Sequence, residues 1–187
     1  MIHLVVKALN ESLVGKKVPE KWDGKAGRYI EILLKDLGLD MQTGYGPDIL
    51  DQKLEVKSRD IDSISPLTIA TMRYSDILET SYYDSLLCDK FQHHIRINTQ
   101  YERIVNVCYW DFRSPLIQDE IAKAYDFGKH QLLQKGEISC TKANNFGYFE
   151  NTDKRYNDLY AFRLTDKNMQ RLAGLSKSVY NNIFEEA

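Results

Sequence analysis

The sequence around Asp48 places two acids and a lysine at a spacing suited to metal-assisted hydrolysis. Asp48 follows Pro47, and Glu55 stands two residues before Lys57. Hydrolysis of a phosphodiester by water needs a divalent cation that polarises the phosphate and lowers the pKa of the attacking water, and Mg²⁺ prefers carboxylate oxygen. A turn at residues 51–52 would bring Glu55 back beside Asp48, so that both carboxylates face one ion.

Lys57 is expected beside that ion. Because side chains alternate along a strand, Glu55 and Lys57 project from one face of a strand predicted over residues 53–57, while Leu54 and Val56 hold it to the core. An ammonium group there would orient or help to deprotonate the attacking water and offset charge that builds up on the phosphate. Such a triplet also occurs by chance, and a plain charged hairpin is the alternative interpretation.

Two charged residues elsewhere fit the same site. Glu31 lies four residues after Gly27 on a predicted helix, so both share one helix face, and the missing side chain of Gly27 would let the carboxylate reach a shared site. Lys90 offers another cation in front of a strand. The chain thus presents a helix acid, a second acid, the acid–lysine pair and a later lysine, in that order.

In these segments the chain resembles the MutH-type branch of the PD-(D/E)XK endonucleases, which includes the mismatch-repair nicking enzyme and several restriction enzymes. The stretch DGKAGRYIE resembles the family's K-G-x-x-G-x-x-x-E helix, PDILDQKLEVK its D-x(6)-E-x-K core, and DKF its later lysine. Residues 116–136 and 159–172 resemble, more loosely, a later helix and the C-terminal strand and helix. One departure is plain, since Asp23 stands where the family has lysine before the first glycine.

The resemblance implies a restriction-endonuclease-like fold, with a central mixed β-sheet flanked by helices in a single nuclease domain over residues 1–187. By resemblance, Asp48 and Glu55 are the metal ligands, Lys57 is the catalytic lysine, Glu31 an accessory acid and Lys90 a second catalytic lysine. The implied cofactor is Mg²⁺, for which Mn²⁺ would substitute, and the implied partner is double-stranded DNA, bound by a monomer or a homodimer.

A type II restriction endonuclease is the expected activity. A mismatch-repair nicking enzyme is an alternative, and so is a catalytically inactive DNA-binding module of the same fold. A third alternative is an unrelated binding domain in which the E-x-K triplet is accidental.

Composition places the chain among soluble, folded proteins, because 43% hydrophobic and 28% charged residues are ordinary values for globular domains. The three cysteines form no C-x-x-C, so neither a disulfide framework nor a zinc knuckle is indicated, and a reducing cytoplasm fits best. The apolar run IHLVV near the N-terminus is too short for a signal peptide or a membrane span, and no membrane partner is expected.

Basic residues are concentrated in the last third of the chain. The formal net charge is −2, but residues 128–177 hold nine basic and five acidic residues, hence +4, which leaves −6 elsewhere. A hydrolase of DNA could show this asymmetry, with acids holding metal and bases holding the backbone, and an unevenly charged surface is the alternative. Residues 141–155 suit a loop that reads a DNA groove, or an idle surface hairpin. The expected DNA contacts are Arg59, Lys142, Asn144, Asn145, Arg155 and Arg163.

Hydrophobic periodicity predicts the elements that would position these groups. A helix over residues 24–39 carries Ala26, Ile30, Leu33 and Leu37 on one face and ends at Gly38. The β-branched and aromatic residues 103–112 predict a buried central strand.

Further along, Pro115 opens a helix that stops near Gly136. Residues 156–165 predict another strand, and Thr165 would cap a final helix. His93 and His94 are expected as a surface pair, since neighbours on a strand diverge and no third soft ligand is suitably spaced.

Overall fold

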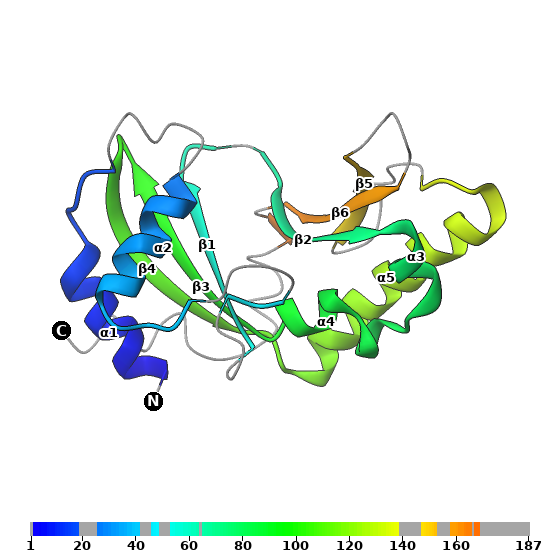
Figure 1. Cartoon of the computed structure of the whole chain (residues 1–187), viewed down its shortest axis with the longest axis horizontal. Helices are drawn as coiled ribbons and strands as arrows, with labels where there is room; N and C mark the ends of the chain where they lie inside the picture. The colour runs from blue at the N-terminus through cyan, green and yellow to red at the C-terminus, as the bar shows by residue number, and fades with distance from the viewer. Residues whose placement is uncertain are drawn as a thin grey trace. The chain divides into compact units, whose positions relative to one another are not determined.

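A computed structural model describes residues 2–18, 26–41, 46–48, 53–63, 65–138, 147–152, 158–165 and 167–168. Helices and strands are interspersed along the chain, so the expected mixed α/β class is confirmed (Figure 1). The described residues form two compact units. The first contains those up to Ser63 together with His93–Asp111, and the second contains those of 65–92 and those from Phe112 on. A single domain stays a prediction, because two compact units can belong to one folding domain or to two.

A three-stranded mixed sheet forms the first unit. β1 (Leu54–Asp60) pairs in parallel with β3 (His93–Gln100), which pairs antiparallel with β4 (Arg103–Asp111). Among the described strands of this sheet β3 is therefore the middle one, and the prediction that residues 103–112 form the central strand is wrong. β4 looks like a central strand in sequence because it buries Tyr109 toward one face and Trp110 toward the other.

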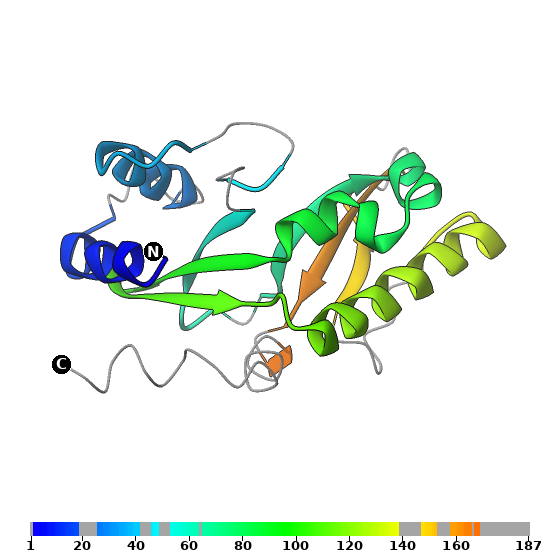
Figure 2. The same cartoon turned by 90° about the horizontal axis from the view of Figure 1, so that it is seen from below.

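Helices α1 (Ile2–Leu13) and α2 (Ala26–Asp36) supply the apolar cover of this sheet (Figure 2). The helix predicted over residues 24–39 is confirmed as α2, but its apolar stripe differs. Ile30 and Leu34 are buried, whereas Leu37 is 44% exposed because the helix has already ended at Asp36. The shared core is made by Val6, Leu9, Leu13, Ile30, Leu34, Leu54, Ile95, Ile97, Ile104, Val107 and Tyr109.

A second, antiparallel sheet forms the core of the other unit. β6 (Leu159–Leu164) lies between β2 (Leu67–Arg73) and β5 (Gly147–Asn151), which confirms the strand predicted near residues 156–165. Thr165 acts as the predicted cap, because its Oγ1 accepts a hydrogen bond from the Asn168 N–H at 3.2 Å.

One long helix packs beside this sheet. α5 (Pro115–Lys135) begins at its proline and ends before Gly136, whose φ of +71° is the left-handed conformation of a helix C-terminus, as predicted. A Cβ on Gly128 would lie 2.5 Å from Cδ2 of Phe149, so the missing side chain lets α5 approach β5 closely.

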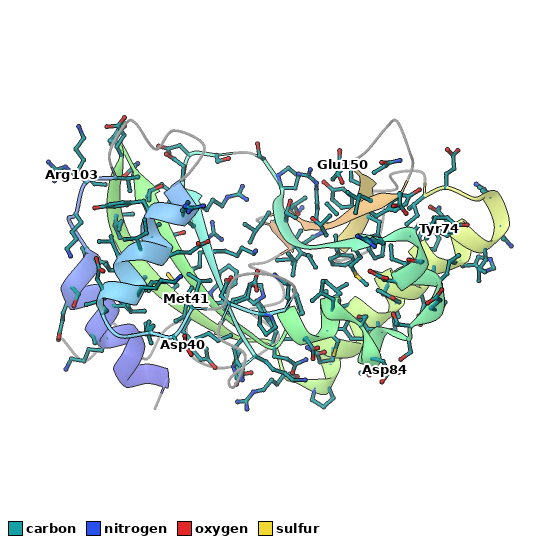
Figure 3. The ribbon with its side chains drawn as sticks, viewed as in Figure 1. Asp40, Met41, Tyr74, Asp84, Arg103 and Glu150 are labelled. Carbon is teal, nitrogen blue, oxygen red and sulfur yellow. The ribbon has the colours of Figure 1, made fainter. Side chains whose placement is uncertain are left out.

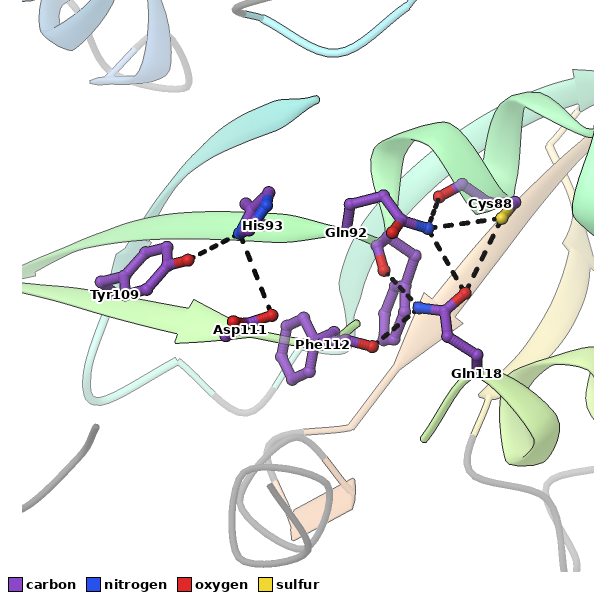
Figure 4. A network of polar contacts seen from close by, with 8 residues as sticks. Cys88, Gln92, His93, Tyr109, Asp111, Phe112 and Gln118 are labelled. Carbon is purple, nitrogen blue, oxygen red and sulfur yellow. Dashed lines mark hydrogen bonds and ion pairs between the residues drawn. The ribbon is translucent and has the colours of Figure 1, made fainter. Parts of the chain in front are cut away.

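Short helical segments complete this unit. They are α3 (Tyr74–Glu79), the 3-10 turn η3 (Tyr82–Asp84) and α4 (Leu86–Lys90). Polar groups of η3 and α4 meet at Gln118 of α5, which is buried. Gln118 Nε2 donates to the carbonyls of Phe91 and Phe112 at 2.8 Å each (Figure 4). Its Oε1 accepts from the Tyr82 hydroxyl at 2.8 Å. This side chain therefore links α5 to the residue Phe91, which precedes β3, and to Phe112, which follows β4.

Candidate catalytic site

Asp48 lies at the edge of β1. Its Oδ2 accepts a hydrogen bond from the backbone N–H of Val56 at 2.6 Å, and Pro47 before it is buried. This bond brings the carboxylate to the strand that carries Glu55 and Lys57. The short strand and turn expected over residues 49–52 lie outside the described residues.

Glu55 and Lys57 contact one another on one face of β1. Nζ of Lys57 lies 2.5 Å from Oε1 of Glu55, and the predicted alternation of the strand puts both side chains on this face. The Glu55 side chain is 1% exposed and that of Lys57 23% exposed. A carboxylate so deeply buried needs a compensating charge, and the ammonium of Lys57 supplies one while its partial exposure connects the pair to solvent.

The donor groups at this strand fit one class of metal ion. Mg²⁺ is commonly held by one or two carboxylates, with water and substrate phosphate as its other ligands, and Asp48 and Glu55 are two such oxygen donors. Among the residues that the structure describes, no three or more His, Cys, Asp or Glu side chains gather as a metal site. Two oxygen donors suit an ion that takes its other ligands from water and substrate.

The two other predicted site residues lie on helices. Glu31 is half-buried on α2, which packs against β1 and contributes Ile30 to the apolar core. Glu55 projects from the opposite face of the sheet to the one that α2 covers, and the role of Glu31 as an accessory acid stays a prediction. Lys90 ends α4 in the second unit, ahead of β3 as predicted, and its catalytic role stays a prediction.

The face of the sheet that carries Glu55 is polar across all three strands, which the sequence reasoning missed. In the β1–β3 register Glu55 is paired with His94, Lys57 with Arg96 and Arg59 with Asn98. In the β3–β4 register these continue to Trp110, Cys108 and Asn106. We call this surface the polar face, and it consists of Glu55, Lys57, Arg59, His94, Arg96, Asn98, Asn106, Cys108 and Trp110.

Contacts within the polar face hold several of its groups in place. The guanidinium carbon of Arg96 lies 5.3 Å from the centroid of the Trp110 ring, within the range of a cation–π interaction. Nδ2 of Asn98 donates to Oδ1 of Asn106 at 2.6 Å and also lies 3.6 Å from Sγ of Cys108. The face is thus an ordered polar layer beside the acid–lysine pair.

The prediction that His93 and His94 form a surface pair is wrong in its burial, since they are 7% and 1% exposed. They diverge as expected. His94 belongs to the polar face, whereas Nδ1 of His93 lies 2.6 Å from the Tyr109 hydroxyl and 4.0 Å from Oδ1 of Asp111 (Figure 4). Both are buried, as is nearly all of β3, which lies between two strands.

The expected DNA contacts fall into three groups. Arg59 belongs to the polar face, is 8% exposed, and donates from Nη2 to the Ser63 carbonyl at 2.7 Å. Arg163 lies on β6 in the second unit, where its Nε is 2.5 Å from Oε2 of Glu150, a residue labelled in Figure 3. The other four, Lys142, Asn144, Asn145 and Arg155, lie outside the described residues.

In the described part of the chain no helix is both long and apolar enough to cross a lipid bilayer. The resemblance to MutH-type endonucleases rests on the motifs around Glu31, Asp48 and Lys57. Comparison with protein-family models and with curated proteins finds no significant match to this chain.

Proposed function

We propose that the chain is a Mg²⁺-dependent DNA endonuclease that hydrolyses phosphodiester bonds at Asp48, Glu55 and Lys57. The observation that carries this proposal is the hydrogen bond from the Val56 N–H to Asp48. It joins an acid eight residues upstream to the strand on which a buried carboxylate contacts a lysine. Two carboxylates and an ammonium are the groups that metal-assisted phosphodiester hydrolysis needs.

Each residue has a distinct role in this proposal. Asp48 and Glu55 would hold Mg²⁺, and when bound the ion polarises the phosphate and lowers the pKa of the attacking water. Burial of Glu55 fixes the direction of its carboxylate, since a side chain packed on all sides has few rotamers. Lys57, held against Glu55, would orient the attacking water and offset negative charge on the phosphate.

The proposed architecture is restriction-endonuclease-like. The parallel β1–β3 pair, the antiparallel β4 and the helices α1 and α2 support it, because this mixed sheet carries the acid–lysine pair on one face and is anchored by apolar residues on the other. Glu31 as an accessory acid and Lys90 as a second catalytic lysine belong to the same proposal by resemblance.

Within this class we favour a type II restriction endonuclease that cuts double-stranded DNA in the cytoplasm, as a monomer or homodimer. An enzyme that nicks one strand, of the mismatch-repair kind, would use the same residues. Sequencing the ends of the cut DNA separates these roles, because discrete sites cut on both strands indicate restriction and cuts in one strand indicate nicking.

Supercoiled plasmid provides the decisive experiment. The protein should cut it in Mg²⁺ or Mn²⁺ and leave it intact in EDTA. Asp48→Ala and Lys57→Ala should lower the cleavage rate by about 10³-fold or more while leaving DNA affinity within about threefold, since they act on the chemical step. Asp36→Ala and Lys53→Ala, at exposed positions of the same unit, are the matched controls and should cut as the wild type does.

Two results would overturn the proposal. DNA binding without cleavage in either metal would indicate an inactive DNA-binding module. Absence of both binding and cleavage would indicate an unrelated domain in which the acid–lysine contact serves only the stability of β1.

A further inference from the structure

The polar face holds a second cation beside Lys57. Arg96 is the register partner of Lys57 across β1 and β3. Partners in adjacent strands lie about 4.8 Å apart and project from the same face of a sheet. The side chains of Lys57 and Arg96 therefore leave the sheet next to each other, within a single unit of the structure.

Trp110 fixes the direction of Arg96. It lies diagonally across the β3–β4 pair, opposite His94, and its ring centre is 5.3 Å from the guanidinium carbon. Attraction between the guanidinium and the face of the ring holds the arginine at this place. Arg96 is 8% exposed and Trp110 is 4% exposed, so packing as well as the ring contact restricts the arginine to few rotamers.

The charges of the polar face suit an anion at this position. Its charged members are one acid, Glu55, and three bases, Lys57, Arg59 and Arg96. Positive charges therefore outnumber negative ones among the members of this face. A phosphodiester beside Lys57 would lie within reach of Arg96, whose fork of donors matches two phosphate oxygens.

We propose that Arg96 is a further catalytic residue, whose guanidinium binds the non-bridging oxygens of the phosphodiester that is cleaved. This inference rests on the proposed nuclease function and names an additional group of the same site. Arg96 offsets the negative charge that grows on those oxygens as water attacks, and it exchanges no proton and forms no covalent bond. Trp110 is a positioning residue that acts through Arg96.

The test uses the full chain and one supercoiled plasmid in Mg²⁺, with enzyme in excess so that the rate reports the chemical step. Arg96→Ala should cut about 10²-fold more slowly than the wild type, with duplex affinity in EDTA changed by less than about tenfold. The cleavage rate of Arg96→Lys should lie between those of the wild type and Arg96→Ala, because lysine keeps the positive charge but lacks the paired N–H donors of the guanidinium. Arg103→Ala is the matched control, since Arg103 is an exposed arginine at the far end of β4, labelled in Figure 3, and should cut within about twofold of the wild type.

Chemical rescue tells a catalytic arginine from a merely structural one. Guanidinium chloride at roughly 50 mM, far below denaturing concentrations, should raise the cleavage rate of Arg96→Ala at least about fivefold and leave Lys57→Ala unchanged. Trp110→Leu should cut about tenfold more slowly, and Trp110→Phe, which restores an aromatic face, should cut within about threefold of the wild type.

The outcomes separate this inference from the function on which it rests. If the wild type cuts and Asp48→Ala does not, but Arg96→Ala cuts within about threefold of the wild type, Arg96 has no catalytic role and only this inference fails. Lys90→Ala is measured alongside, because loss of cleavage there with full cleavage in Arg96→Ala would assign the second cation to Lys90. If the wild type neither binds nor cuts DNA, the proposed function fails and this inference fails with it.

Discussion

The backbone N–H of Val56 donates to Oδ2 of Asp48 at 2.6 Å. Through this bond Asp48 both holds residues 46–48 to the edge of β1 and brings its carboxylate to the proposed metal. A structural and a catalytic role therefore meet in one side chain, and two substitutions can separate them.

Asp48→Asn should keep the fold and lose activity. The amide oxygen of asparagine accepts the Val56 hydrogen bond, whereas its missing charge weakens the hold on Mg²⁺. Asp48→Ala should lose both the Val56 hydrogen bond and the activity. Its free energy of unfolding should be lower by about 1–3 kcal/mol, since a partly buried N–H loses its charged acceptor. Urea unfolding and plasmid cleavage together check this, and an active Asp48→Asn protein would show that the charge is not needed.

Lys57 should contribute stability as well as chemistry. Lys57→Met leaves the buried Glu55 carboxylate without its ammonium, and we expect the free energy of unfolding to fall by about 1–3 kcal/mol, less than for a fully buried pair because Lys57 is 23% exposed. Glu55→Gln combined with Lys57→Met should recover part of that loss.

A double-mutant cycle over the four proteins measures this coupling by urea unfolding, and Lys53→Met at an exposed position is the control. If the two single changes are additive, the 2.5 Å contact adds nothing to stability.

Gln118 should be the most sensitive polar residue of the second unit. Gln118→Ala deprives the Tyr82 hydroxyl and the Phe91 and Phe112 carbonyls of their partner, and each buried group left without one costs about 1–3 kcal/mol. We expect the free energy of unfolding, measured by thermal or urea denaturation, to fall by at least about 3 kcal/mol. Gln134→Ala, on the exposed end of α5, should change stability by less than about 0.5 kcal/mol.

Buried tyrosines should make the protein sensitive to alkali. Burial raises the pKa of Tyr82, Tyr125 and Tyr160 above the ordinary tyrosine value. A folded-state pKa above the unfolded one means that this contribution to stability is fully present below about pH 10 and is lost as the pH rises toward the folded-state pKa.

The free energy of unfolding should therefore decline above about pH 10, by up to about 1.4 kcal/mol per pH unit for each such tyrosine. Tyr82→Phe should make the decline shallower when urea unfolding is followed from pH 8 upward, whereas Tyr101→Phe, at a position 83% exposed, should not. An unchanged slope in Tyr82→Phe would show that Tyr82 ionises as readily in the folded as in the unfolded chain.

Sequence patterns predict best those structural features that depend only on residues close together in the chain. Pro115 and Gly136 mark the ends of α5 because their backbone preferences act locally, and the alternation from Leu54 to Lys57 gave the two faces of β1. Helix α1 is not among the predicted elements although Val6, Leu9 and Leu13 have helical spacing, because the apolar run IHLVV is too short for a signal peptide or a membrane span and carries no helix signal beyond that spacing.

What the sequence could not supply was the pairing between distant segments. Arg96 stands next to Lys57 only because β1 and β3 are parallel neighbours in one register, which no local pattern records. A signal was present in the alternation of His94, Arg96 and Asn98 with Ile95 and Ile97, which is typical of a strand with one polar and one apolar face. It shows that a polar face exists but not which strand lies beside it.

The path of the chain through its two units limits which fragments of the protein can fold. It leaves the first unit after Ser63, returns at His93 and leaves again after Asp111, so neither unit is a continuous stretch. A fragment that ends after β1 therefore lacks the strand β1 pairs with, and its edge would offer unpaired backbone groups to other chains, inviting aggregation. Half-length fragments should accumulate as insoluble material. During synthesis the β1–β3 ladder can form only after the ribosome has made the intervening residues and β3 itself.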